Sequence, residues 1–125
     1  MKITGFQPLI ISPNADELIR LFEDLGFEKN HEKTGIDDKE ISNVSMKDAN
    51  GNRVDVTKGA GVLRDMAAIR INVEDFPEAF QVLTKHGFRN AQGYKLTQTS
   101  TSTDTLMVSP SGFGIVLSQH FKNKP

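Results

Sequence analysis

The chain contains 125 residues, of which 37% are hydrophobic and 25% charged, and its formal net charge is −1. A chain of this length forms one compact domain or two half-domains that share a core, and its balanced charge gives no electrostatic footprint for nucleic acid or an anionic membrane. The absence of cysteine excludes disulfides, thiolate nucleophiles and cysteine-based zinc sites. No segment has the apolar length of a signal peptide or a membrane span, so we expect a cytoplasmic protein.

The first half of the chain predicts the order β-α-β-β-β. Residues 3–11 are apolar and β-rich, and they lead to Ser12-Pro13-Asn14, a turn and helix-start signal. Apolar residues at helical spacing predict a helix over 15–25 that ends before Gly26. The remaining segments predict strands over 27–34, 41–47 and 53–57, with turns at 35–38 and 48–51.

The second half repeats this order. A strand over 67–73 precedes a helix over 75–86, whose first turn tolerates Pro77. The segments that follow predict strands over 88–95, 102–108 and 113–118, a polar connection over 96–101, a turn at 109–112 and a polar tail from residue 120. We therefore expect one module over about 1–58, a linker over about 59–65 and a second module over about 66–121.

Two segments look like copies of one unit, SPNADELIRLFEDLGF at 12–27 and VEDFPEAFQVLTKHGF at 73–88. Both end in Gly-Phe, and the two pairs lie 61 residues apart. The same shift maps Met46 onto Met107 and the turn residue Gly51 onto Gly112 without an insertion. Self-similarity at a fixed spacing indicates a duplicated structural unit, so the two halves can be compared position by position.

Two further motifs indicate a family. Leu25-Gly26-Phe27 follows the first helix, and the run SPSGFGIVL at 109–117 is similar to an Asp-Pro-x-Gly-Asn turn followed by a last strand. In order and spacing, nearly the whole chain resembles the vicinal oxygen chelate superfamily, which includes glyoxalase I (lactoylglutathione lyase), extradiol dioxygenases, fosfomycin-resistance proteins and bleomycin-binding proteins. The resemblance implies an α+β fold in which two tandem βαβββ modules form a curved mixed sheet, a cup with helices on its outer face. It also implies a homodimer.

The resemblance further implies four metal ligands, one from the first strand and one from the last strand of each module. These positions are Gln7 and Asp55 in the first module, and Ala68 and Val116 in the second. Alanine and valine cannot coordinate a metal, whereas a catalytic metal normally needs at least three protein ligands. We therefore expect no metal cofactor, with Gln7 and Asp55 as residual positions. The alternative is a divalent metal completed by a partner chain or by substrate.

Strand alternation places further polar side chains on the face of these positions. Arg53 shares its face with Asp55, Arg70 and Asn72 lie on the first strand of the second module, and Tyr94 lies on a strand that borders the cup in this family. A few polar groups in a partly apolar concavity are typical of a small-molecule site, and two arginines can grip a carboxylate or phosphate. The predicted ligand-binding set is Gln7, Arg53, Asp55, Arg70, Asn72 and Tyr94.

The same residues also allow a structural interpretation. Arg70 can pair with Asp55, and Arg53 can be solvated at a strand edge. The opposite faces of the strands are apolar, and their residues, Phe6 among them, are expected to pack under the helices. The Ser/Thr-rich segment 97–105 suits either a lid over the cup or a β-hairpin with an exposed polar face.

Three functions stay open at this point. The first is a glyoxalase/bleomycin-resistance-like protein that lacks the catalytic metal and binds a small, anionic molecule in the cup. The second is a divergent lyase, isomerase or dioxygenase-type enzyme of the same superfamily, in which Asp55 is the base or a partial metal ligand. The third is a structural or regulatory dimer whose cup is filled by side chains.

Overall fold

The computed structural model describes residues 1–36, 41–58, 62–91, 97–98 and 102–120. Two compact units are distinguished by their internal contacts. The first unit is Gln7–Ala67, and the second unit combines Met1–Phe6 with Ala68–Pro125. Strand β1, Ile3–Ser12, therefore contributes its first residues to the second unit and its remaining residues to the first.

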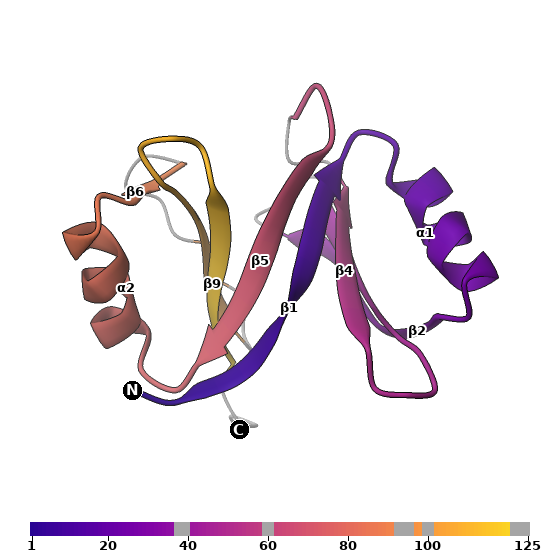
Figure 1. The fold of residues 1–125 in the computed structure, drawn as a ribbon, viewed down its shortest axis with the longest axis horizontal. Coiled ribbons are helices and arrows are strands. Elements are labelled where there is room, and N and C mark those ends of the chain that lie inside the picture. Colours follow the sequence, from indigo (N-terminus) through magenta and orange to yellow (C-terminus); the bar gives the residue numbers. More distant parts are fainter. Residues whose placement is uncertain (37–40, 59–61, 92–96, 99–101, 121–125) are drawn as a thin grey trace. The chain divides into compact units, whose positions relative to one another are not determined.

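The first unit contains most of β1, helix α1 and three further strands. The helix is α1 (Ala15–Asp24), and the strands that follow are β2 (Glu28–Ile36), β3 (Ile41–Lys47) and β4 (Arg53–Lys58). Strand β1 runs parallel to β4, while β2, β3 and β4 are antiparallel neighbours, so the strand order is β2-β3-β4-β1 (Figure 1). The long connection through α1 provides the crossover that the parallel pairing of β1 and β4 requires.

The second unit repeats this arrangement with a different set of short strands. Its elements are β5 (Met66–Val73), α2 (Phe76–Lys85), β6 (Arg89–Asn90), β7 (Thr97–Gln98), β8 (Ser102–Val108) and β9 (Gly114–His120). Strand β5 runs parallel to β9, β9 is antiparallel to β8, and both β6 and β7 pair with β8. The predicted α+β class with two tandem modules of mixed sheet and helix is therefore confirmed.

The strand registers of the two units are related by the 61-residue shift. Leu9 lies opposite Asp55 between β1 and β4, and Arg70 lies opposite Val116 between β5 and β9. The helix ends match as well, because Gly26 and Gly87 both have positive φ, at +107° and +89°. Each glycine is followed by a backbone amide that reaches back to the last turn of the helix, at 2.9 Å in the first unit and 3.0 Å in the second. This is the helix ending that favours glycine.

Each helix packs on the apolar face of the strands of its own unit, as the alternation predicted. In the first unit the buried core is Val44, Met46 and Val54, with Ile10, Ile19, Phe22 and Phe27 packed against it. In the second unit it is Val73, Phe76, Ala79 and Leu117, with Ile71, Phe80 and Leu83 packed against it. The expectation for Phe6 is wrong, since its side chain is 62% exposed. The second-unit core is built on β5, β9 and α2, and Phe6 lies on β1.

Most element boundaries differ from the predicted ones by one residue or less, and three departures are larger. Strand β2 continues through Gly35 and Ile36, which were predicted as a turn, because Ile36 pairs with Ile41 after a register shift. Strand β7 falls within the predicted polar connection and pairs with β8, as the β-branched residues of the segment favour. Strand β9 extends to His120, which was predicted to begin a tail. The predicted strand over 88–95 and the segment 97–105 lie partly outside the described residues.

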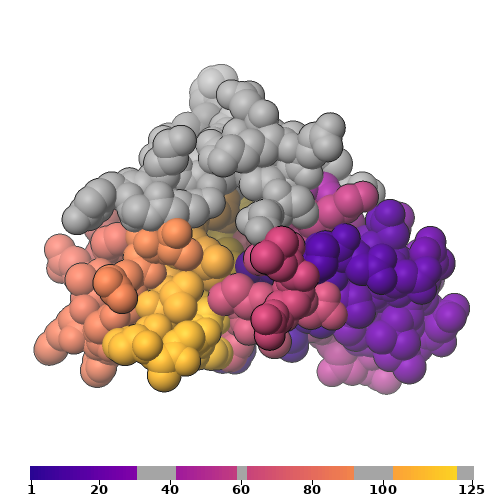
Figure 2. All heavy atoms as spheres, turned by 90° about the horizontal axis from the view of Figure 1, so that it is seen from above, coloured from indigo at the N-terminus to yellow at the C-terminus, as the bar shows by residue number. Residues whose placement is uncertain are grey.

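The segment between β4 and β5 is exposed where it is described. Residues just after the gap at 59–61 lie on the visible surface in the space-filling view (Figure 2), and the Leu63 side chain is 96% exposed. Neither helix within the described residues combines the length and the apolar character that spanning a membrane would require.

Candidate functional site

Gln7 and Asp55 are held together in the first unit by the parallel pairing of β1 with β4. Asp55 lies opposite Leu9, so Gln7, two residues earlier on β1, shares its face. Gln7 Nε2 donates a hydrogen bond to Asp55 Oδ1 at 3.0 Å, and Asn43 Nδ2 on β3 donates to Asp55 Oδ2 at 3.4 Å. Thr57 Oγ1 in turn donates to Asn43 Oδ1 at 2.7 Å. We call these four residues the first-unit cluster.

In the first-unit cluster, hydrogen-bond donors of the protein take the place of the water that would solvate the Asp55 carboxylate. Asp55 is only 1% exposed and Gln7 6% exposed, and the adjacent residues on their face, Leu9 and Ile11, are buried. A buried carboxylate is costly unless hydrogen-bond donors replace the water it has lost. Amide N–H groups on both carboxylate oxygens contribute to this replacement.

This donor arrangement does not match the metal site that the fold family implies. Gln7 turns the N–H side of its amide toward Asp55, so the two side chains face each other as donor and acceptor. A metal ion would require their oxygen lone pairs to converge on one point. The corresponding residues of the second unit are Ala68 and Val116, which have no donor atom. Among the residues that the structure describes, no three His, Asp or Glu side chains are grouped so as to hold a metal ion.

The second unit contains its own polar network, which we call the second-unit cluster: Arg70, Asp104 and Ser118. Arg70 Nη1 donates to Ser118 Oγ at 2.7 Å and to Asp104 Oδ1 at 3.5 Å, and Ser118 Oγ donates to the same Asp104 oxygen at 2.5 Å. The side chains of Arg70 and Asp104 are 12% and 20% exposed. The network is therefore mostly enclosed yet reaches the surface.

The two clusters occupy equivalent positions in the duplicated units. The 61-residue shift maps the pair Asn43 and Thr57 onto Asp104 and Ser118, and both pairs are in register and hydrogen-bonded. The first strands differ, because β1 contributes Gln7, Leu9 and Ile11 where β5 contributes Ala68, Arg70 and Asn72. Each unit thus has a hydrogen-bonded polar pair across its last two strands. The residue that its first strand contributes to the cluster differs, Gln7 in the first unit and Arg70 in the second.

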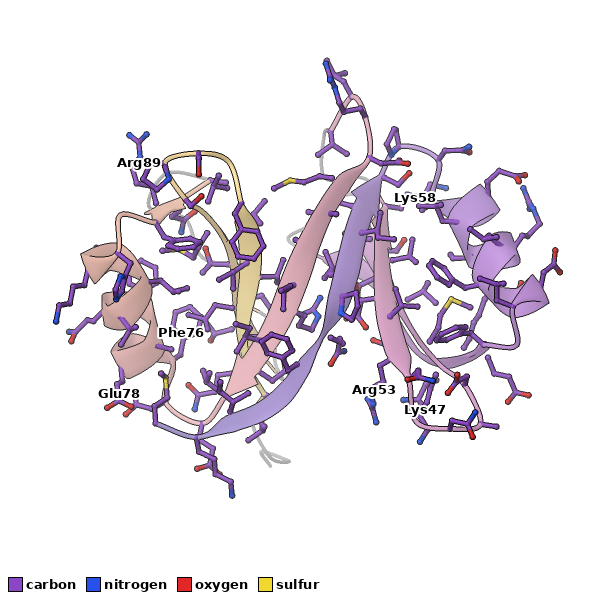
Figure 3. All side chains as sticks on the ribbon, in the orientation of Figure 1. Lys47, Arg53, Lys58, Phe76, Glu78 and Arg89 are labelled. Carbon is purple, nitrogen blue, oxygen red and sulfur yellow. The ribbon has the colours of Figure 1, made fainter. Side chains whose placement is uncertain are left out.

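The remaining predicted site residues are Asn72, which borders the second-unit cluster, Arg53, which lies apart from both clusters, and Tyr94. Asn72 follows Arg70 on the same face of β5, opposite Ser118 on β9. Arg53 is exposed at the start of β4, where it lies opposite Lys47 near the hairpin turn (Figure 3). Its placement fits the alternative of a solvated strand end. Tyr94 lies outside the described residues.

Sequence reasoning missed Asn43 and Asp104, the residues that hold the two clusters together. A signal for both was available. They are polar residues 61 positions apart on the strand that neighbours the last strand of each module, and each lies opposite a hydroxyl residue. Applying the repeat comparison to polar positions as well as to the implied metal ligands would have found them.

Comparison with known proteins gives similarity in structure only. No protein-family model matches the sequence, and a search of curated proteins finds no match. A methylmalonyl-CoA epimerase from Mycobacterium tuberculosis superposes with a TM-score of 0.70 at 16% identity, covering 96% of this chain and 90% of that one. The epimerase of Streptomyces coelicolor (Q60A), in complex with 2-nitronate-propionyl-CoA, gives 0.65 at 14% identity, covering 94% and 98%.

A third similar structure is a glyoxalase/bleomycin resistance protein/dioxygenase superfamily member from Vibrio splendidus 12B01. Its TM-score is 0.59 at 19% identity, and the match covers 94% of this chain and 99% of that one. Because all three matches extend over nearly the whole chain, the chain has the vicinal oxygen chelate fold. At these identities the likeness concerns the fold, since one fold hosts many functions.

Proposed function

We propose that this chain is a glyoxalase/bleomycin-resistance-type protein that binds a small, anionic molecule without the catalytic metal of its fold family. The observation that carries the proposal is the 3.0 Å hydrogen bond from Gln7 Nε2 to Asp55 Oδ1. Gln7 and Asp55 stand at positions that the resemblance assigns to metal ligands, and here they form a hydrogen bond with each other. A protein that keeps the fold and uses these positions for internal hydrogen bonds is better suited to binding than to metal-assisted chemistry.

Burial argues against Asp55 as a general base. A catalytic base must come within hydrogen-bond reach of the proton that it removes from the substrate. Asp55 is 1% exposed, and each of its oxygens accepts a hydrogen bond from an amide group of the first-unit cluster. A substrate would have to displace Gln7 or Asn43 to reach it.

A small-molecule ligand is supported by the partly exposed Arg70 and by a structural neighbour. The Streptomyces coelicolor epimerase was captured with 2-nitronate-propionyl-CoA, so this fold accommodates a small organic ligand. In the present chain Arg70 supplies a fixed positive charge on β5, and arginine is well suited to recognising carboxylates.

Metal analysis tests the first part of the proposal. Protein purified after incubation with Ni²⁺, Zn²⁺ or Fe²⁺ and then desalted is expected to hold well below one metal ion per chain. The variant Asp55→Asn tests the implied ligand position directly, and Asp24→Asn, at the exposed end of α1, is the matched control. Stoichiometric metal that is retained by the wild type and by Asp24→Asn but lost in Asp55→Asn would overturn the proposal.

Thermal unfolding with a panel of small carboxylates, phosphates and acyl-CoA analogues tests the second part. A ligand at about 100 times its Kd stabilises the folded state by about 2.7 kcal/mol, which is readily measured as a rise in Tm. A panel without any effect would favour the filled, structural alternative.

We also propose that the chain forms a homodimer. In the described part of the chain, β2 ends the strand order of the first unit, and β6 ends that of the second. Exposed sheet edges must be covered or paired to avoid uncontrolled association. Light scattering on a size-exclusion column is expected to give twice the chain mass of 13.8 kDa, and the mass of a single chain would contradict the dimer.

A further inference from the structure

Two positions on β5 are polar where the duplicated unit is apolar. Leu9 and Ile11 on β1 are 1% and 3% exposed, and the 61-residue shift maps them onto Arg70 and Asn72. The surrounding register is the same in both units, so the difference lies in the side chains and not in the backbone. A guanidinium and an amide at positions that are apolar in the first unit need a compensating interaction.

The amide oxygen of Asn72 lacks that compensation. Asn72 Oδ1 is buried and has no hydrogen-bond partner among the residues that the structure describes. A buried acceptor without a donor destabilises the folded state, because the water it has lost is not replaced. The orphaned oxygen therefore indicates a site for a hydrogen-bond donor that is not part of the described chain.

The amide of Asn72 is positioned by Gly5. A Cβ atom at residue 5 would lie 2.6 Å from Asn72 Nδ2, which is closer than nonbonded atoms approach. Glycine at this position of β1 leaves room for the amide, and both residues belong to the second unit. The absence of a side chain at residue 5 therefore lets the amide lie beside the backbone of β1.

Arg70 is fixed on the same face of β5, two residues before Asn72. Ser118 and Asp104 both contact its Nη1 atom and hold the guanidinium in place. Residues two apart on a strand are separated by about 6.6–6.8 Å along the chain. One small molecule can therefore contact both side chains at once.

We propose that Arg70 and Asn72 bind a small hydroxy acid, whose carboxylate meets the Arg70 guanidinium and whose hydroxyl donates to Asn72 Oδ1. This inference rests on the proposed binding function and names its ligand class. A neutral hydroxyl suits the orphaned oxygen better than an ammonium group, because a cation would be repelled by Arg70. Asp104, which lies 3.5 Å from Arg70 Nη1, favours a singly charged carboxylate over a doubly charged phosphate.

Matched acids test the assignment. The probes are glycolate and L-lactate, compared with acetate and propionate, which lack only the hydroxyl group. Binding measured by calorimetry is expected to be about tenfold tighter for each hydroxy acid, which is the effect of one hydrogen bond to an otherwise unsatisfied group. Equal affinity within each pair would overturn the assignment, and so would failure of all four probes to bind.

Four variants separate the roles. Arg70→Met is expected to weaken both members of each pair about equally, and Asn72→Leu to abolish the preference for the hydroxyl. Gly5→Ala is expected to do the same as Asn72→Leu by displacing the amide, in a backbone that alanine can adopt. Asp104→Asn is expected to tighten all the acids by removing a nearby negative charge. Arg89→Met, at an exposed arginine on β6 (Figure 3), is the control without effect.

The outcomes distinguish this inference from the proposed function. If another class of small molecule raises the Tm while the hydroxy acids do not, the hydroxy-acid assignment fails and the binding function stands. If purified protein retains stoichiometric metal through Asp55, the proposed function fails. A loss of hydroxyl preference in Asn72→Leu that Gly5→Ala does not reproduce would remove Gly5 as a positioning residue. Far-UV circular dichroism of each variant verifies that it is folded.

Discussion

Thr57 on β4 donates a 2.7 Å hydrogen bond to Asn43, which lies directly opposite it on β3. The same contact recurs in the second unit, where Ser118 donates a 2.5 Å hydrogen bond to Asp104. Duplication has therefore kept a cross-strand hydroxyl-to-oxygen contact while the surrounding residues changed. In the first unit the contact orients the Asn43 amide so that its N–H group faces Asp55.

Thr57→Val is expected to destabilise the protein by about 1–2 kcal/mol, because valine keeps the shape of threonine and removes the donor to Asn43 Oδ1. Thr57→Ser retains the hydroxyl and should cost clearly less. Urea unfolding of the two variants at pH 7 provides the comparison. Equal stability of Thr57→Val and the wild type would show that the hydrogen bond contributes nothing to folding.

Gln7 and Asp55 are expected to be energetically coupled. A hydrogen bond to a charged group contributes about 1.5–3 kcal/mol, and the Gln7 amide donates to the Asp55 carboxylate inside the protein. A double-mutant cycle of Gln7→Met and Asp55→Ala is expected to give a coupling energy in that range. A cycle of Gln7→Met with Asp24→Asn, whose side chain is exposed, should be additive within about 0.5 kcal/mol. Additivity in the first cycle would contradict the pairing.

The fold could be predicted because its signals are local and occur twice. Apolar spacing marks the two helices, and glycine marks the backbone positions where a side chain is strained. Gly26 and Gly87 end the two helices at positive φ. Gly51 and Gly112 also have positive φ, and they lie in the hairpin turns. Because these signals recur at one spacing, they predicted a 61-residue repeat, and the strand registers of the two units show the same shift.

The site could be predicted only in part. Alternation along β1 and β4 is a property of each strand, so it placed Gln7 and Asp55 on one face. The donors to a side chain also depend on how neighbouring strands align, so alternation along β1 and β4 alone did not identify Asn43. The orphaned oxygen of Asn72 depends on the approach of the β1 backbone at Gly5, and no sequence pattern reports that distance.

The turn at Asp48 is expected to make stability depend on pH in the acid range. Hydrogen bonds from the side chain and then the backbone of Asn52 lower the pKa of Asp48 below its ordinary value of 3.8. A carboxyl group with a lowered pKa in the folded state stabilises the protein above its unfolded pKa and loses this contribution as pH falls through its folded pKa. The stabilisation should therefore be complete at pH 7 and decline below about pH 4.

Asp48→Ser tests this, because serine stands at the equivalent position, Ser109, in the second unit and accepts a hydrogen bond there from the Phe113 amide at 2.9 Å. The difference in unfolding free energy between wild type and Asp48→Ser should shrink between pH 5 and pH 2.5. Ser109→Ala, which removes a group that does not titrate, should show a difference that is constant with pH. A constant difference for Asp48→Ser would remove the carboxylate from the acid dependence.

Gly87→Ala is expected to cost more stability than Gly26→Ala, although both glycines end a helix in the same way. A side chain in the left-handed region costs about 1–2 kcal/mol, and both positions have positive φ. A Cβ atom at Gly26 would meet nothing within 4 Å, whereas one at Gly87 would lie 3.1 Å from Pro110 Cγ. The proline ring cannot rotate away, so strain in the hairpin turn adds to the backbone cost. Urea unfolding of the Gly26→Ala variant measures the backbone cost, and the additional loss in Gly87→Ala measures the effect of the Pro110 contact. Equal losses would show that the turn yields to the added methyl group.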